Sequence, residues 1–208
     1  MAKNNVVFVI FFSLAFLIVL LHFLFHPVRV LGMSTSIFYL DEKVTLSAFF
    51  SIVTAFLTGF WCLMFIDKLK NQKEKLFWLA LGVFFLILSI DEYLEIHEYI
   101  NTLVKLSFEK GNLIGQLAHF SWIFPLFLVI ISFFAIFLWG IVNEKNSQIK
   151  SALATGTFFF VIVLVFEVLG AMNFGKHIYL YLVALEEGAE MFGTTFFLLA
   201  ALNKQKSL

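Results

Sequence analysis

The sequence predicts an all-α polytopic membrane protein, in which six transmembrane helices form a single bundle and both termini are cytoplasmic. Three observations lead to this fold class. Of 208 residues, 62% are hydrophobic and 13% are charged, which is more apolar surface than a soluble chain of this length can bury. Six apolar stretches are long enough to cross about 30 Å of hydrocarbon. The basic residues also lie mainly on one side of the predicted membrane.

The six predicted helices follow one another with short polar connections, and no long linker separates them. Each stretch is about 20 residues long, the length that spans a bilayer at a rise of about 1.5 Å per residue. The predicted spans are Val6–Phe25, Val44–Ile66, Leu76–Ile100, Ala118–Val142, Ala152–Leu169 and Ile178–Leu202. We therefore expect residues 1–208 to form one transmembrane domain.

The basic residues predict the orientation of this domain. When the connections alternate across the bilayer, nine lysines fall on the side of both termini and five basic residues fall on the other side. Because lysine and arginine are enriched in cytoplasmic connections, the side with nine lysines is expected to face the cytoplasm.

The overall charge narrows the range of partners. Fourteen basic residues balance fourteen acidic residues, so no net positive field is available to attract nucleic acid. Cys62 is the only cysteine, which excludes an internal disulfide and a CxxC metal or redox motif. We expect the lipid bilayer to be the main partner of the chain.

The acidic residues have an unusual distribution along the predicted helices. Eight of the fourteen lie within predicted helices, in the half of the membrane opposite the lysine-rich side, and no basic residue lies in the middle of a span. A carboxylate near the centre of a bilayer costs roughly 2.5–3.5 kcal/mol on insertion scales, so a bound cation or protons must balance these groups. The eight acids are Asp91, Glu92, Glu95, Glu98, Glu167, Glu186, Glu187 and Glu190.

Two antiparallel helices present similar acidic segments, DEYLE at 91–95 and EEGAE at 186–190. At about 100° per residue, Glu95 and Glu98 lie within about 40° of Asp91 on one acidic stripe. His97 falls about 240° from Asp91, off that stripe, unless a bend or an unwound turn brings it round. An inverted repeat would place its second copy in the opposite half of the membrane, so we interpret the two segments as converging on one site.

Several motifs resemble those of an uncharacterised bacterial multi-pass membrane protein family, from Phe38 onward. They are FYLDEK at 38–43, DExxxxHE from Asp91 to Glu98, WxxP from Trp122 to Pro125, ExLG from Glu167 to Gly170, and an EExxEMxG-like stretch from Glu186 to Gly193. The resemblance implies a location in the bacterial plasma (inner) membrane, and the distribution of lysines then predicts that the acidic site lies toward the extracytoplasmic side. It implies no established activity, so the chemistry must come from the residues themselves.

Carboxylates with one or two imidazoles favour a divalent metal site, and such an oxygen-rich set suits Fe, Mn or Zn. The predicted ligands are Asp91, Glu92, Glu95, Glu98, His119, Glu167, Glu186, Glu187 and Glu190, with His97 as a weaker candidate. We expect a mononuclear or dinuclear site in a membrane metalloenzyme, a hydrolase or an oxidoreductase, that acts on a lipidic or lipid-soluble substrate.

Two alternatives remain open from the sequence. The same carboxylates suit the relay of a proton- or cation-coupled membrane transporter, or they are protonated and hydrogen-bonded in a non-catalytic membrane subunit. The remaining polar residues have simpler expected roles: His22, His26 and His177 as interfacial aromatic side chains, and Asp41 and Glu42 as a solvated helix-capping segment.

Overall fold

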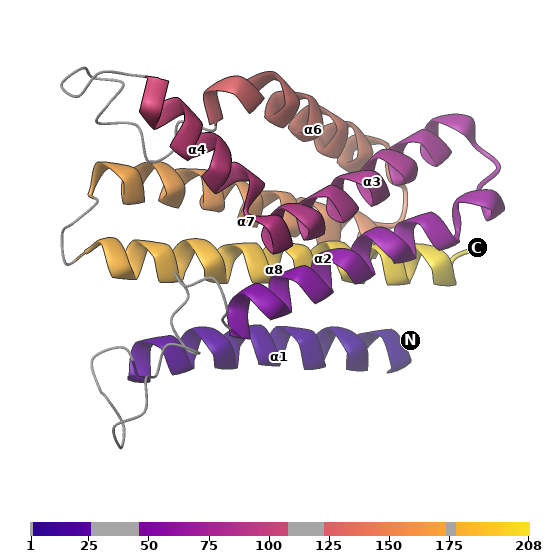
Figure 1. Ribbon diagram of the computed structural model, residues 1–208. Helices are drawn as coiled ribbons and strands as arrows, with labels where there is room; N and C mark the ends of the chain where they lie inside the picture. The colour runs from indigo at the N-terminus through magenta and orange to yellow at the C-terminus, as the bar shows by residue number, and fades with distance from the viewer. Residues whose placement is uncertain (1, 26–45, 108–122, 174–177) are drawn as a thin grey trace.

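The computed structural model describes residues 2–25, 46–107, 123–173 and 178–208 (Figure 1). Within these ranges the chain is helical and contains no strand, which confirms the predicted all-α class. Six of the described helices have 19 residues or more, and a shorter one, α4, lies at one end of the bundle (Figure 1). The helices are α1 (Ala2–Phe25), α2 (Leu46–Met64), α3 (Gln72–Leu94), α4 (Ile96–Ser107), α6 (Ile123–Asn143), α7 (Ser147–Met172) and α8 (Tyr179–Lys206).

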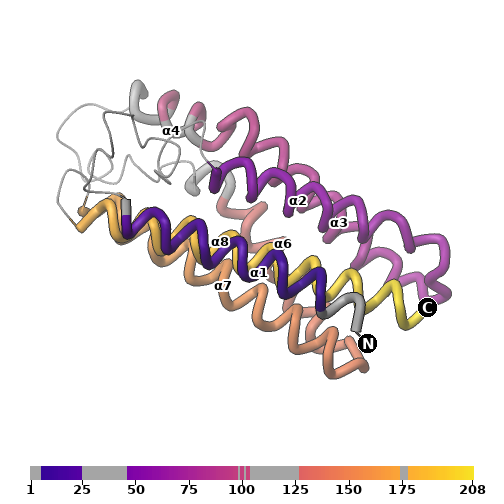
Figure 2. The backbone as a smooth tube through the Cα atoms, turned by 90° about the horizontal axis from the view of Figure 1, so that it is seen from below, coloured from indigo at the N-terminus to yellow at the C-terminus, as the bar shows by residue number. Residues whose placement is uncertain are grey.

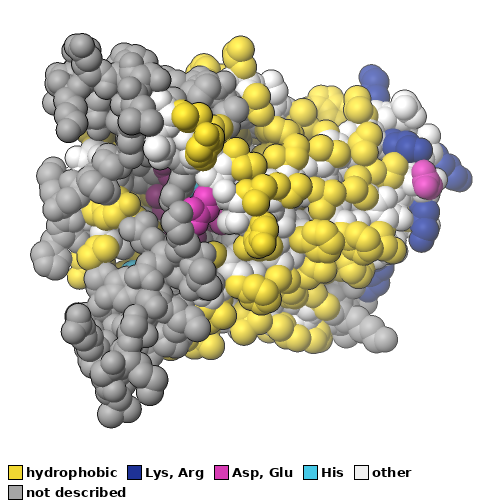
Figure 3. Space-filling view, in the orientation of Figure 1, with side chains coloured by type: hydrophobic (Ala, Val, Ile, Leu, Met, Phe, Trp, Pro, Cys, Tyr) yellow, Lys and Arg dark blue, Asp and Glu magenta, His cyan; other side chains and the backbone are white. Residues whose placement is uncertain are grey.

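Among the described residues, four segments are long and apolar enough to cross a membrane: Val6–Leu24, Leu46–Lys68, Gln72–Leu94 and Ser147–Met172. The part of α6 from Phe127 to Asn143 is apolar but shorter. Figure 3 shows a broad hydrophobic band across the middle of the face in view, as expected for a surface in contact with lipid. The full set of six spans stays a prediction.

Helix α8 lies at the centre of the bundle, where it packs against α1, α2 and α7. Glycines bring neighbouring helices close together. A Cβ atom on Gly156 of α7 would lie 2.8 Å from the Phe197 ring of α8, and one on Gly59 of α2 would lie 2.8 Å from the Gly82 carbonyl oxygen of α3. Such close crossings are typical of helices packed within lipid, because small residues allow the backbones to approach.

Both chain termini lie at the same end of the bundle, together with the α2–α3 and α6–α7 connections (Figures 1 and 2). Lysine side chains gather there, at the right of Figure 3, and we call it the lysine end. One of them, Lys204, is only 7% exposed. Its Nζ atom contacts Glu74 Oε1 and lies 3.1 Å from Glu144 Oε2, so the ammonium group joins α8 to the beginning of α3 and the end of α6.

The third helix differs from the prediction at its end. A single helix over Leu76–Ile100 was expected, but α3 ends at Leu94 and α4 begins at Ile96. Between them, Glu95 has φ 53° and ψ 42°, the left-handed conformation, and is the only non-glycine residue with positive φ in the described part of the chain. The Asp91 side chain accepts a hydrogen bond from the His97 backbone N–H at 3.0 Å, which stabilises the beginning of α4.

Candidate functional site: an acid-lined cavity

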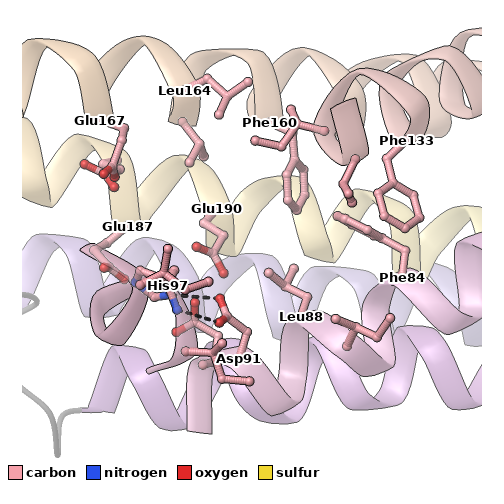
Figure 4. A pocket seen from close by; sticks show the side chains of 18 of the residues that line it. Phe84, Leu88, Asp91, His97, Phe133, Phe160, Leu164, Glu167, Glu187 and Glu190 are labelled. Carbon is pink, nitrogen blue, oxygen red and sulfur yellow. Dashed lines mark hydrogen bonds and ion pairs between the residues drawn. The ribbon is translucent and has the colours of Figure 1, made fainter. Parts of the chain in front are cut away.

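A cavity of about 560 Å³ lies between α3, α4, α6, α7 and α8, toward the end opposite the lysine end (Figure 4). We call it the acidic cavity. Its polar lining residues are seven acids and one histidine: Asp91, Glu92, Glu95, His97, Glu167, Glu186, Glu187 and Glu190. Seven of the nine predicted ligands therefore line one cavity, together with the weaker candidate His97. Their role as metal ligands stays a prediction.

The other polar residues singled out in the sequence lie outside the described residues or away from the cavity lining. Glu98 belongs to α4, but its side chain lies outside the described residues, as does all of His119. The same holds for His26, Asp41, Glu42 and His177.

His22 is buried against neighbouring side chains in the last turn of α1, at 3% exposure, and its predicted place at the membrane interface stays a prediction. Helix α1 packs closely on α8 in this region. Val19, nearly one turn before His22 on α1, lies 3.0 Å from the position that a Cβ atom on Gly188 would occupy. The absent side chain at Gly188 allows the two helices to approach closely at Val19.

Asp91 and His97 form the best-defined contact in the acidic cavity (Figure 4). The Asp91 Oδ2 atom lies 2.8 Å from His97 Nδ1, and Asp91 Oδ1 accepts the His97 backbone N–H at 3.0 Å. In a continuous helix His97 would point away from Asp91. The break at Glu95 turns the chain so that the imidazole lies against the carboxylate.

The acids of α7 and α8 lie on the other side of the cavity. Glu186 of α8 and Glu167 of α7 line the same cavity and interact electrostatically, an arrangement in which like charges favour a proton on one of the two carboxyl groups. The Oε1 atom of Glu190 is buried, and no described residue provides it with a hydrogen-bond partner. A buried carboxylate oxygen without a donor is costly, so the arrangement favours an added proton or cation beside Glu190.

The charge in the acidic cavity is one-sided. No lysine or arginine is among the described residues that line it. Carboxylates that share a site repel one another when ionised, and a low-dielectric environment increases the repulsion. The cavity can therefore hold its acids only if protons or a bound cation reduce their net charge.

The other half of the cavity is apolar. Its lining includes Phe84, Phe133, Phe137 and Phe160. The Phe84 ring centroid lies 4.5 Å from that of Phe133 and 5.2 Å from that of Phe137. The Phe137 ring contacts Phe197 of α8, with centroids 5.1 Å apart, and both belong to the buried hydrophobic core. The cavity thus has an acidic half and an aromatic half that packs on the core.

Metal-binding geometry is not preformed in the described residues. Among them, no group of three or more His, Cys, Asp or Glu side chains is arranged to hold a metal ion. An ion in the acidic cavity would have to draw carboxylates together.

These features define an all-helical protein with membrane-spanning character and one acid-lined cavity. Residues 4–204 match the family model described as a domain of unknown function (DUF8692), and the chain belongs to that family. This agrees with the predicted membership of an uncharacterised family; the bacterial origin and the family motifs stay predictions. Comparisons with curated proteins and with solved structures found no match.

Proposed function

We propose that this protein is an integral-membrane metalloenzyme whose acidic cavity binds a divalent metal ion and acts on a lipidic or lipid-soluble substrate. The observation that carries the proposal is the set of seven acids and one histidine around a single cavity whose described walls contain no lysine or arginine. A divalent cation is the most direct way to balance these charges, because one ion offsets two carboxylates.

The proposed membrane arrangement has six spans, with both termini in the cytoplasm. Four segments long and apolar enough to cross a membrane support it, as does the gathering of lysines at the end that carries both termini. In this orientation the acidic cavity lies toward the extracytoplasmic side of a bacterial plasma membrane. A substrate dissolved in the outer leaflet would then reach the cavity without crossing the bilayer.

Fe, Mn or Zn is the proposed metal, because oxygen ligands with an imidazole suit these ions. Glu167, Glu186, Glu187 and Glu190 would supply oxygen ligands from α7 and α8. A bound ion of this kind lowers the pKa of coordinated water toward about 7, or, if it is redox-active, supports an oxidation. The residues of the chain would hold the ion, orient the substrate and exclude bulk water.

The shape of the cavity supports a substrate with a polar part and an apolar part. Its volume of about 560 Å³ lies within the range of small-molecule sites, roughly 300–1,000 Å³. An apolar group would pack against Phe84, Phe133 and Phe160, while a polar group would face the acids. This division favours a lipid-like molecule over a fully water-soluble metabolite.

A proton- or cation-coupled transporter is the second candidate. The interaction between Glu186 and Glu167 favours it, because neighbouring carboxyl groups can share a proton within the bundle. The aromatic half of the cavity argues against a transporter, because in the described part of the chain its phenylalanine rings lie between the acids and the lysine end. A transport path would require these rings to separate.

Metal analysis of the purified full-length protein tests the proposal. After loading with Fe, Mn or Zn and removal of free metal, the wild type should retain about one ion or more per chain. Glu186→Gln combined with Glu190→Gln should abolish retention. Asp67→Asn, which makes the same kind of change at a fully exposed side chain of the lysine end, should leave it intact.

Less than about a tenth of an ion per chain in the wild type would overturn the metal proposal. Proton flux in proteoliposomes that is lost in the Glu186→Gln variant would then establish the transporter. Absence of both metal and flux, with an unchanged fold after neutralisation of the acids, would identify a non-catalytic membrane subunit.

A further inference from the structure

We propose that the acidic cavity binds a lipid-like amine, whose ammonium group lies among the acids beside Glu190 and whose apolar chain extends along the phenylalanine rings. This inference rests on the proposed function, which describes the substrate only as lipidic or lipid-soluble, and it adds the chemical class of the polar group. Three features carry it: an acceptor that lacks a donor, the position of that acceptor, and the sign of the charge around it.

Glu190 presents the cavity with an acceptor that lacks a donor. Its Oε1 atom is buried and has no hydrogen-bond partner among the described residues. Asp91, by contrast, uses both of its oxygens on His97, one for the backbone N–H and one for the ring nitrogen. A buried acceptor without a donor is costly, so a ligand that brings an N–H to Glu190 gains from a contact that the described chain does not supply.

Glu190 lies at the boundary between the acidic half and the aromatic half of the cavity (Figure 4). Gly193 follows it by nearly one turn of α8, and a Cβ atom on Gly193 would lie 2.9 Å from the Phe160 ring of α7. The ring therefore packs against α8 directly beyond the carboxyl group. A ligand whose polar end contacts Glu190 would place its next atoms against Phe160, so one molecule can use both halves of the cavity.

The spacing along two other helices gives the length available to the apolar chain. Asp91 and Phe84 are seven residues apart on α3, and Glu167 and Phe160 are seven residues apart on α7. At about 1.5 Å per residue, each pair spans roughly 10 Å along its helix. The acids and the rings therefore form two levels with the same separation on both helices, which fits an extended molecule with its polar group at one end.

The charge of the cavity selects an amine over other polar groups. Seven acids line it, and no lysine or arginine is among the described residues that do so. The proposed divalent ion offsets two carboxylates, so the remaining acids still favour a cationic ligand. An ammonium group brings both a positive charge and N–H donors, whereas a hydroxyl group brings no charge and a carboxylate or phosphate is repelled. The faces of the phenylalanine rings also attract a cation.

The acids are also placed where an amphiphile in the membrane can reach them. Figure 3 shows acidic side chains at the surface, at the edge of the hydrophobic band. The Asp91 side chain is 23% exposed. An amphiphile keeps its charged group near the interface and its chain in the hydrocarbon. A lipid-like amine would therefore approach with its ammonium group level with the acids and its chain level with the phenylalanines.

Photo-crosslinking of the full-length protein in phosphatidylcholine nanodiscs tests the proposal. The probe is decylamine with a diazirine near the end of its chain, used after a chelator has removed metal ions. Mass spectrometry should locate the crosslinks in peptides that contain Phe84, Phe133 or Phe160. Unlabelled decylamine should compete with the probe. Decanol and decanoate, which have the same number of carbon atoms but no ammonium group, should compete at least about 10-fold less well.

Variants at Glu190 separate the charge of the acceptor from its presence. Glu190→Gln keeps an acceptor oxygen but loses the charge, and it should weaken binding of decylamine by about 10- to 100-fold, as expected for the loss of a charged hydrogen bond. Glu190→Asp keeps the carboxylate and should retain more binding than Glu190→Gln. Asp67→Asn, at a fully exposed side chain of the lysine end, is the matched control and should bind the amine as the wild type does.

Equal competition by decylamine and decanol, crosslinks confined to other parts of the chain, or undiminished binding in Glu190→Gln would each overturn the inference. Metal retention, measured separately, distinguishes its failure from that of the proposed function. A protein that retains Zn²⁺ or Mn²⁺ but does not select the amine would keep the metalloenzyme and exclude an amine substrate. A protein that selects the amine but retains no metal would support the amine site and overturn the metal proposal.

Discussion

At the lysine end, the Lys204 ammonium group lies between the carboxylates of Glu74 and Glu144, whereas the acidic cavity holds seven acids and no described lysine or arginine. The first region is a buried charge network that supplies its own counter-charges. The acidic cavity has an excess of acidic groups over basic ones. The comparison indicates that Lys204 has a structural role, whereas the cavity acids bind a cation or protons that come from outside the chain.

The largest expected effect is at the lysine end. Lys204→Met should destabilise the protein by about 3 kcal/mol or more, because Glu144 and Glu74 would remain without their shared cation. Thermal unfolding in detergent measures the change. Lys206→Met, on the same helix but at an exposed position, is the control and should have little effect. Equal melting temperatures for the two variants would show that the network does not hold the helices together.

The next effect is at the acidic cavity and depends on metal. A ligand that binds only the folded state at 100 times its Kd stabilises that state by about 2.7 kcal/mol. We therefore expect Zn²⁺ or Mn²⁺ to raise the melting temperature of the wild type but not that of the Glu186→Gln, Glu190→Gln double variant. The same shift in both proteins would place the ion outside the cavity.

Neutralising a single cavity acid should not lower the stability of the protein, in contrast to the loss of Lys204. Without metal, Glu190→Gln removes a buried carboxylate whose Oε1 has no described partner, so stability should be unchanged or should rise by about 1 kcal/mol. Chemical denaturation of the metal-free protein measures this. A loss as large as that of Lys204→Met would mean that Glu190 is a structural residue, and the contrast between the two ends would fail.

The smallest effect concerns the break between α3 and α4. Glu95→Gly removes the strain of a left-handed non-glycine residue and should change stability by less than about 1 kcal/mol, in the stabilising direction. Glu95→Val, which is β-branched, should be destabilising. The two melting temperatures provide the check. If valine is tolerated as well as glycine, the left-handed turn is not a feature of the folded protein.

The sequence was sufficient to predict the all-α fold class and the position of most spans. It also predicted that the acids gather in one region. A long run of hydrophobic residues indicates a segment in contact with lipid. The rise per residue gives the depth of each acid from its distance along its own helix, and these depths are similar for Asp91, Glu167 and Glu186. For this reason, seven of the nine predicted ligands line one cavity. These are properties of single helices, and they do not depend on how the helices pack.

The break at Glu95 and its consequences could not be predicted in the same way. DEYLEIH contains neither glycine nor proline, the residues that usually end a helix, so the pattern favours continuity. The break depends on a side chain, Asp91, that caps the following helix. Similarly, Lys204 is an ordinary residue near the end of a helix in sequence, and only packing shows its two carboxylate partners from α3 and the end of α6.

The central claim is that a metal ion neutralises the acidic cavity, and anomalous X-ray scattering from crystals loaded with Mn²⁺ or Zn²⁺ tests it most directly. The account predicts an anomalous peak at about 2.0–2.2 Å from carboxylate oxygens of the cavity. Saturated crystals that show no peak there would contradict it: the acids would then be balanced by protons alone.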